Sequence, residues 1–189
     1  MSDTLQAARY YRSCGLSIIP VKADGSKSPA FTGWRKHSNT LPTDDDVSGW
    51  FTSAAGVGVG IVPGPASGHL VVLDFEFVGE SAYFEWYQRL PDDLRDLVDT
   101  LPAAVTPSGG RHVYVRLPDS QPGTKLARYA KGKTKIEVRG EGHQVLAPGC
   151  PAECHPSGKL YEWATPPAGD DPFPVVEWDE WSALCEVAQ

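Results

Sequence analysis

The stretch HLVVLDFEF (His69 to Phe77) is an apolar run that two acidic residues, Asp74 and Glu76, interrupt. Its Val, Leu and Phe content is typical of a β-strand that is buried on at least one face. Side chains two residues apart on a strand point to the same face, so we expect Asp74 and Glu76 to project together, beside Val72. The opposite face, which we expect to be the core side, carries Leu73, Phe75 and Phe77.

The close spacing of these two acids has two interpretations. Like charges at this distance repel unless a cation or a basic group lies between them, and carboxylate oxygens are hard ligands that suit Mg²⁺ or Mn²⁺. Alternatively, both acids are solvated on the outward face of an edge strand. The pair taken alone leaves both interpretations open.

A Ser-Gly-Gly turn follows in TPSGGRHVYV, just before a second strand-like segment that begins near His112. Glycines allow backbone N–H groups to approach an anion closely, which makes Gly109 and Gly110 candidates for phosphate binding. The side chains of Ser108 and His112 can each donate a hydrogen bond to phosphate oxygens. The alternative is an ordinary hairpin connection.

A third segment, TKIEVRG (Thr134 to Gly140), places Glu137 and Arg139 on one face of an alternating strand. Glu137 makes a third carboxylate available for metal coordination. Arg139 either neutralises a triphosphate or pairs with Glu137 or Glu141, and the spacing does not choose between these roles.

The charge of the chain is unevenly distributed. The net charge is −7, yet the segment from Arg111 to Arg139 carries eight Lys or Arg against two acids, a net +6 that leaves −13 elsewhere. We expect substrate phosphate to approach this segment, and a solvated basic loop is the alternative. The basic residues are Arg111, Arg116, Lys125, Arg128, Lys131, Lys133, Lys135 and Arg139.

The remaining sequence pattern predicts an α+β fold with a sheet covered on one face by helices. We expect helices over 4–13, from Thr43 onward, over 81–90 and over 175–187. We expect strands over 16–21, 57–62, 69–77, 111–117, 134–140 and 143–148, and a final strand in GKLYEWATPP.

Neither an export signal nor an apolar stretch of membrane-spanning length occurs in the sequence. We therefore expect a cytoplasmic protein with no membrane partner. The four cysteines are few and irregularly spaced, so we expect reduced thiols. Cys150, Cys154 and His155 form a Cys-x3-Cys-His pattern without a second cysteine pair, and we expect no zinc site there.

The three motifs together resemble the archaeo-eukaryotic primase superfamily, in its bifunctional primase-polymerase (Prim-Pol) branch of phage and plasmid replication proteins. They are Asp74-Phe75-Glu76, Ser108-Gly109-Gly110-Arg111-His112 and Glu137-Val138-Arg139-Gly140, in the family's order. The flanking stretches agree over roughly residues 5 to 163. They are GLSIIPV with the following Lys27 loop, VGVGIVPGPASGHLVVLD, GHQVLAPG and HPSGKLYEW.

This resemblance implies a primase-like catalytic core, an RRM-like mixed or antiparallel sheet with flanking helices, plus a small N-terminal α/β module. We expect a single domain over 1–189, with the N-terminal module at 1–65, the catalytic sheet at 66–165 and a C-terminal tail or helix at 166–189. By the same resemblance Asp74, Glu76 and Glu137 would bind two Mg²⁺ or Mn²⁺ ions. Ser108 and His112 would grip the phosphates.

The resemblance also implies template-directed joining of nucleotides, with template and primer DNA, nucleoside triphosphates and a helicase domain or protein as partners. Only 26 residues follow Trp163, so we expect no helicase or helical accessory region within this chain. Lys27, in a Gly, Ser and Lys loop, is a candidate nucleotide contact, with a solvated loop lysine as the alternative. Glu137 departs from the aspartate that is more common in the family.

Two other functions use the same residues. Acids and a histidine around two ions serve a metal-dependent nuclease or phosphohydrolase equally well. The third interpretation is a non-catalytic DNA-binding module in which the acids have only a structural role.

Overall fold

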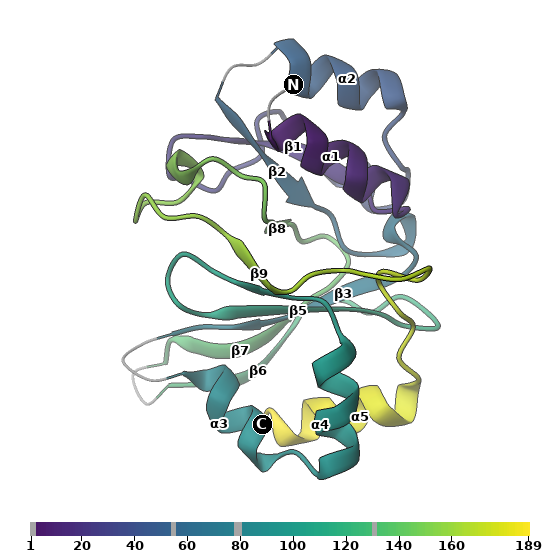
Figure 1. Ribbon diagram of the computed structural model, residues 1–189, viewed down its shortest axis with the longest axis vertical. Helices are drawn as coiled ribbons and strands as arrows, with labels where there is room; N and C mark the ends of the chain where they lie inside the picture. The colour runs from purple at the N-terminus through teal and green to yellow at the C-terminus, as the bar shows by residue number, and fades with distance from the viewer. Residues whose placement is uncertain (1–2, 54–55, 78–80, 130–131) are drawn as a thin grey trace.

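The acid-bearing strand, β3 (Leu70–Phe75), is the third of six strands in the larger sheet of the computed structural model (Figure 1). The structure describes residues 3–53, 56–77, 81–129 and 132–189. The strand order is β6-β7-β3-β5-β4-β9, and every neighbouring pair is antiparallel. The other strands of this sheet are β4 (Ala103–Val105), β5 (Arg111–Arg116), β6 (Thr124–Arg128), β7 (Thr134–Arg139) and β9 (Glu162–Thr165).

A second, antiparallel sheet lies beside the first and has the order β1-β2-β8. Its strands are β1 (Ile18–Lys22), β2 (Val57–Ile61) and β8 (Val145–Leu146), and helices α1 (Asp3–Ser13) and α2 (Asp44–Ser53) cover it (Figure 1). Strand β8 follows β7 in the sequence but belongs to this smaller sheet. The smaller sheet therefore takes residues from both sides of the predicted boundary at residue 65. Three short 3-10 helices complete this region: η1 (Trp34–Ser38), η2 (Pro65–Ser67) and η3 (Ala152–Cys154).

Side chains on both faces of β3 are buried. Val71, Leu73 and Phe75 pack against three helices on one side, while Leu70 and Val72 pack against the N-terminal sheet on the other. The three helices are α3 (Ala82–Arg89), α4 (Asp92–Thr100) and α5 (Trp178–Val187), which lie together below the sheet in Figure 1. Helices thus cover one face of the sheet as predicted, and the N-terminal module covers the other face, which the sequence pattern did not indicate.

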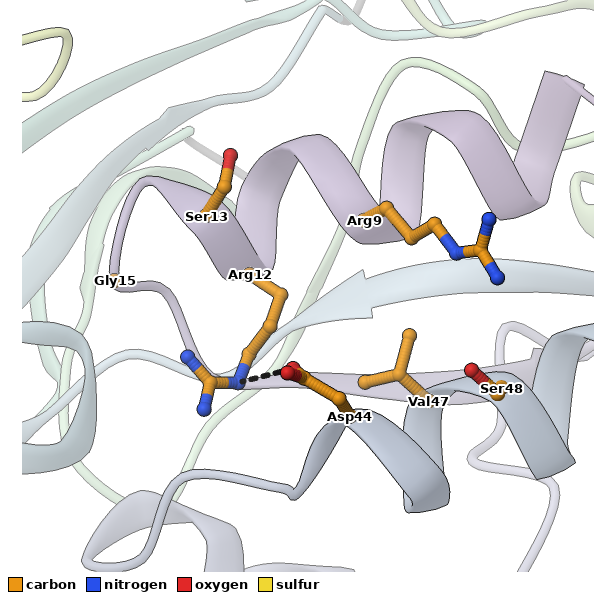
Figure 2. Close-up of a pocket in the computed structure, with 7 residues that line it drawn as sticks. All are labelled: Arg9, Arg12, Ser13, Gly15, Asp44, Val47 and Ser48. Carbon is orange, nitrogen blue, oxygen red and sulfur yellow. Dashed lines mark ion pairs between the residues drawn. The ribbon is translucent and has the colours of Figure 1, made fainter.

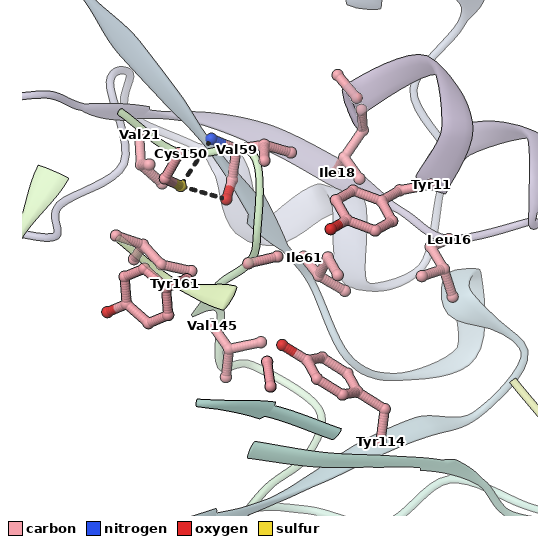
Figure 3. Packing of buried hydrophobic residues seen from close by; sticks show 14 of the residues in the cluster. Tyr11, Leu16, Ile18, Val21, Val59, Ile61, Tyr114, Val145, Cys150 and Tyr161 are labelled. Atoms are coloured by element: carbon pink, nitrogen blue, oxygen red, sulfur yellow. Dashed lines mark hydrogen bonds between the residues drawn. The ribbon is translucent and has the colours of Figure 1, made fainter. Parts of the chain in front are cut away.

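The N-terminal core joins the two sheets through aromatic and branched side chains. Tyr11 of α1 and Tyr114 of β5 enter it from opposite sides, and Val145 of β8 lies near the Tyr114 ring (Figure 3). The Tyr11 hydroxyl donates a hydrogen bond of 2.7 Å to the Pro148 carbonyl, which satisfies its only buried polar group. The module is thus fixed to the six-stranded sheet by a continuous core.

Cys150 and Cys154 are part of this core. The Cys150 thiol lies 3.2 Å from both the N–H and the carbonyl of Val59 (Figure 3). A Cβ added to Gly58 would lie only 2.3 Å from the sulfur of Cys154, which explains why glycine occupies this strand position. All four cysteines are free thiols.

The mixed α+β class predicted from the sequence is confirmed, but several elements were misplaced or missed. Strand β3 ends at Phe75 rather than Phe77, and the Phe77 side chain is 41% exposed instead of facing the core. Helix α4 was missed although Asp92 and Asp93 open it and Leu94 and Val98 form a buried stripe. The prediction also missed two strands, β4 because it is short and β6 because it is an exposed edge.

Arg116 ties the end of β5 to the N-terminal module. Its guanidinium donates to the Cys14 carbonyl at 2.7 Å and to the Ser67 carbonyl at 3.1 Å. Gly68 lies close enough that an added Cβ would be 3.0 Å from the Arg116 Nε. This member of the basic segment has a structural role, because both carbonyls depend on it.

We predict that Arg116→Met lowers the free energy of unfolding by about 2–4 kcal/mol, because two partly buried carbonyls lose a charged donor. Urea denaturation followed by circular dichroism measures this. Lys125→Met, on the exposed edge strand, is the matched control and should change stability by less than about 0.5 kcal/mol. Equal losses in the two variants would contradict the structural role of Arg116.

Candidate active site

Three predicted site residues form a row across the middle of the large sheet. In the antiparallel register, Asp74 of β3 lies directly opposite His112 of β5 on one side and Glu137 of β7 on the other. Directly opposed residues share a face, so the three side chains project together toward the N-terminal module. All three are buried, with at most 8% of each residue exposed.

Arg139 lies between two of the predicted metal ligands. Its Nε donates to the Asp74 carboxylate at 3.1 Å, and its Nη2 lies 2.5 Å from Glu137 Oε1. The sequence left open whether Arg139 pairs with an acid or with a phosphate, and the structure shows the acid pairing. The protein itself therefore supplies a basic group between Asp74 and Glu137.

His112 contacts Asp74 from the opposite side. Its Nε2 lies 3.5 Å from Asp74 Oδ1, and the Tyr114 hydroxyl lies 3.4 Å from its Nδ1. A proton on Nε2 of this ring would be donated to the Asp74 carboxylate. The carboxylate of Asp74 is thus held by one strand neighbour on each side.

The environment shifts the pKa values of Asp74 and Glu76 in opposite directions. Burial alone would raise the pKa of Asp74, but His112 and Arg139 outweigh it, so the pKa of this carboxyl lies below its ordinary value. Burial raises the pKa of Glu76, and the charge of Asp74 adds to this effect. Asp74 is therefore the firmly ionised member of the pair. An added cation would stabilise the ionised form of Glu76 most, because burial and Asp74 both disfavour that form.

Ser108 is presented by a tight turn that its glycines make possible. Gly109 has a φ of +90°, and a Cβ added to Gly110 would lie 2.2 Å from the Phe75 carbonyl oxygen. The N–H groups of Gly109 and Gly110 donate to the backbone carbonyl and the side-chain oxygen of Thr106, respectively. The glycines thus shape the turn, while phosphate binding by their backbone stays a prediction.

Lys27 reaches the site from the loop after β1. Its backbone is left-handed, with a φ of 58°, and its carbonyl accepts a hydrogen bond of 2.9 Å from the Gln144 side chain. Lys27 lines the same cavity as Asp74, Glu76 and Arg139, and its charge acts on Glu76. The structure therefore brings the predicted loop lysine to the carboxylates.

His155 is a site residue that the sequence interpretation missed. The Ser157 N–H donates to His155 Nδ1 at 3.1 Å, so the neutral ring carries its proton on Nε2, which lies 3.2 Å from Ser108 Oγ. Burial, helped by the charge of Lys27, lowers the pKa of His155 and favours this neutral ring. The stretch HPSGKLYEW carried the signal, but His155 was considered only as part of a zinc pattern.

Other cavity residues come from three different segments of the chain. Tyr161 packs its ring between His112 and His155, with ring centres 6.0 and 6.1 Å away. Thr106, Gln144, Val145 and Leu146 complete the lining. Because β8 supplies the last two residues, the site lies between the two sheets.

The basic segment does not form one continuous phosphate-binding edge. Arg116 is structural, Arg111 stacks on Tyr83 at 4.6 Å, and Lys135 pairs with Glu85. Lys125 is the cross-strand neighbour of Glu137 and so lies on the same face as the site. Lys131 lies outside the described residues.

The carboxylates suit a hard divalent cation by their chemistry, because Asp74 and Glu137 lie on one face of the sheet and Glu76 lines the same cavity as Asp74. With Arg139 between Asp74 and Glu137, however, no three His, Cys, Asp or Glu in the described ranges are gathered closely enough to hold a metal ion. In this structure the cation beside Asp74 and Glu137 is the Arg139 guanidinium.

A larger hollow of about 600 Å³ lies elsewhere, between α1 and α2 (Figure 2). Arg9, Arg12 and Asp44 line it, and none of the predicted catalytic residues does. Arg12 is used locally, since its Nε donates to the Pro42 carbonyl at 2.8 Å and lies 3.9 Å from the Asp44 carboxylate. We therefore place the active site at the smaller cavity with the carboxylates.

Comparison with known proteins identifies the family of the chain. The family described as "Bifunctional DNA primase/polymerase, N-terminal" (Prim-Pol) matches residues 7–181 of the 189-residue chain. No individual curated protein matches the chain significantly. None of the helices in the described part of the chain has the length and apolar character that a membrane crossing requires. The match covers both sheets and all three motifs, and the chain therefore belongs to the Prim-Pol family of DNA primase/polymerase domains.

Proposed function

We propose that this domain joins nucleotides on a DNA template by two-metal nucleotidyl transfer, with Asp74, Glu76 and Glu137 as the metal ligands. The observation that carries the proposal is the cross-strand row of Glu137, Asp74 and His112, which lies beside a cavity that Glu76, Lys27 and Arg139 also line. Mg²⁺ or Mn²⁺ bound there would activate the 3′-hydroxyl of the primer and neutralise charge on the triphosphate.

The remaining cavity residues bind and orient the nucleotide. Lys27 and Arg139 offer positive charge to the triphosphate, and Ser108 offers a hydroxyl proton. His155 donates its own proton to Ser108 Oγ, so the serine hydroxyl is free to point its hydrogen at a phosphate oxygen. Phosphoryl transfer depends chiefly on positioning and charge neutralisation, and these groups supply both.

The biological setting that we propose is replication of a phage or plasmid genome. A helicase domain or protein would supply the single-stranded template. This part of the proposal follows from the family resemblance, and co-purification of the domain with a replicative helicase from its host would test it.

The first prediction concerns Asp74. Asp74→Asn keeps the size of the side chain but removes its charge, and it should lower primer extension at least about 100-fold on a primed template with dNTPs and Mn²⁺. Asp93→Asn, an exposed acid on α4, is the control and should retain full activity. Thermal melting verifies that both variants fold.

The products of the same assay separate the three functions. Extended primers from the wild-type domain support nucleotidyl transfer, and shortened strands would instead identify a nuclease. If the wild-type domain binds DNA but changes neither strand, and Asp74→Asn leaves Mn²⁺ binding unaltered, the carboxylates are structural and the proposal fails.

The second prediction concerns Arg139, which cannot neutralise the carboxylates and a triphosphate at the same time. Arg139→Gln should tighten Mn²⁺ binding about 10-fold in calorimetry without nucleotide, because a competing cation is removed from Asp74 and Glu137. The same variant should weaken dNTP binding at least about 10-fold, since a charge-assisted hydrogen bond is lost.

Lys125→Gln is the matched control, because it removes a positive charge from the same face of the sheet without touching Asp74. It should leave the Mn²⁺ affinity nearly unchanged. If Arg139→Gln also leaves it unchanged, Arg139 does not compete with the ion.

The third prediction concerns His155 as a positioning residue for Ser108. His155→Ala should raise the KM for dNTP several-fold with little change in kcat, because Ser108 loses the donor that orients its hydroxyl. The effect should vanish in a Ser108→Ala background, where nothing is left to orient. Fully additive effects of the two substitutions would contradict this coupling.

A further inference from the structure

A second hollow lies beside the catalytic cavity and has no role in the function described so far. Its volume is about 560 Å³, and it shares Thr106 and Ser108 with the catalytic cavity. Phe77, which follows the predicted metal ligand Glu76 directly, forms part of its wall. The two hollows are therefore adjacent parts of one surface around the Ser108 turn.

The wall of this hollow exposes apolar side chains that the core does not use. Phe77 is 41% exposed and Leu160 is 50% exposed, and both line the hollow. The Phe77 ring lies against the Ser108 turn, since a Cβ added to Gly109 would be 3.4 Å from its Cγ. Single exposed apolar residues are common, but two that share one hollow beside an active site indicate a binding surface.

The charged groups of the hollow indicate what kind of ligand it accepts. Lys159 and Glu162 both line it, so its formal charge is zero. The groups that can neutralise a triphosphate, Lys27 and Arg139, line the catalytic cavity instead. The hollow therefore suits a flat, weakly charged group with hydrogen-bond donors and acceptors at its edge, and a nucleobase has these properties.

We propose that this hollow binds one unpaired base of the DNA template, stacked on Phe77 and Leu160. Stacking on an aromatic ring is the usual way in which proteins hold single-stranded bases without reading their sequence. A template nucleotide brings a single phosphodiester charge, whereas a free nucleotide would bring its triphosphate, which suits the cavity that Lys27 and Arg139 line. The inference rests on the proposed function, because it gives the template a place beside the carboxylates.

The first test measures DNA binding without divalent ions or nucleotides, so that it does not depend on catalysis. Fluorescence anisotropy with a labelled single-stranded oligonucleotide should show about 5- to 100-fold weaker binding for Phe77→Ala, the loss expected for one stacked base. Phe77→Trp should retain the affinity. Phe84→Ala is the control, because Phe84 is 57% exposed but lies on α3 outside the hollow.

The second test places a single abasic nucleotide at successive template positions of a primed duplex. The wild-type domain should bind more weakly when one particular position near the primer end lacks its base, and Phe77→Ala should lose this position dependence. Phe77→Leu, which keeps an apolar side chain without the flat ring, should behave like Phe77→Ala if the ring itself is needed. It also replaces that variant if thermal melting shows Phe77→Ala to be unfolded.

The inference is overturned if Phe77→Ala and Phe84→Ala weaken DNA binding equally, or if neither does. It is also overturned if Phe77→Ala weakens a fluorescent dNTP analogue and leaves single-stranded DNA binding intact, because the base would then belong to the incoming nucleotide. If the wild-type domain fails to extend primers while the Phe77 effect on DNA binding persists, the polymerase function fails and base binding in the hollow stands.

Discussion

The structure depends on how the charge of Asp74 is accommodated in the middle of a six-stranded sheet. A buried carboxylate is strongly destabilising unless charged or hydrogen-bonding partners surround it. Asp74 obtains one such partner from each neighbouring strand, His112 from β5 and Arg139 from β7. A slip of either neighbouring strand by one residue would turn its partner to the opposite face. The site and the strand register are therefore specified by the same contacts, and removal of either partner would disturb both.

The position of the carboxylates also explains the layered arrangement around the sheet. The face opposite to Asp74 is fully apolar along β3, and α3, α4 and α5 cover it. The face of Asp74 is apolar only at Leu70 and Val72, and the N-terminal module covers that part, which leaves the acidic end of the strand at the junction of the two sheets. Loops from the module, including the one that carries Lys27, can reach the carboxylates because β8 returns from the catalytic region to pair with β2. The cavity is thus made by both sheets, although its charged row belongs to one of them.

Local patterns in the sequence were sufficient for the α+β class and for most strands, because alternation is a property of a single strand. They could not show that Arg139 occupies the space between Asp74 and Glu137. This position depends on the register of β3 and β7, and Asp74 and Arg139 are 65 residues apart in the sequence. His155 was missed for a similar reason, since its contact with Ser108 joins residues 47 positions apart. Phe77 was assigned to the core because alternation was extended past Phe75, where the strand ends. The errors therefore lie where long-range pairing or a strand end decides the position of a side chain.

Arg139 gives the proposed reaction a physical order. While it pairs with Asp74 and Glu137, the acids are neutralised by the protein and have less affinity for an external cation. A triphosphate offers the guanidinium an alternative anion of higher charge, so a nucleotide that draws Arg139 away would leave the carboxylates ready for divalent ions. Coupling of this kind is reciprocal: nucleotide must strengthen ion binding by the same factor by which ions strengthen nucleotide binding. Glu76, whose pKa is raised by burial and by Asp74, would gain most from the exchange, because an added cation relieves the repulsion that Arg139 leaves in place.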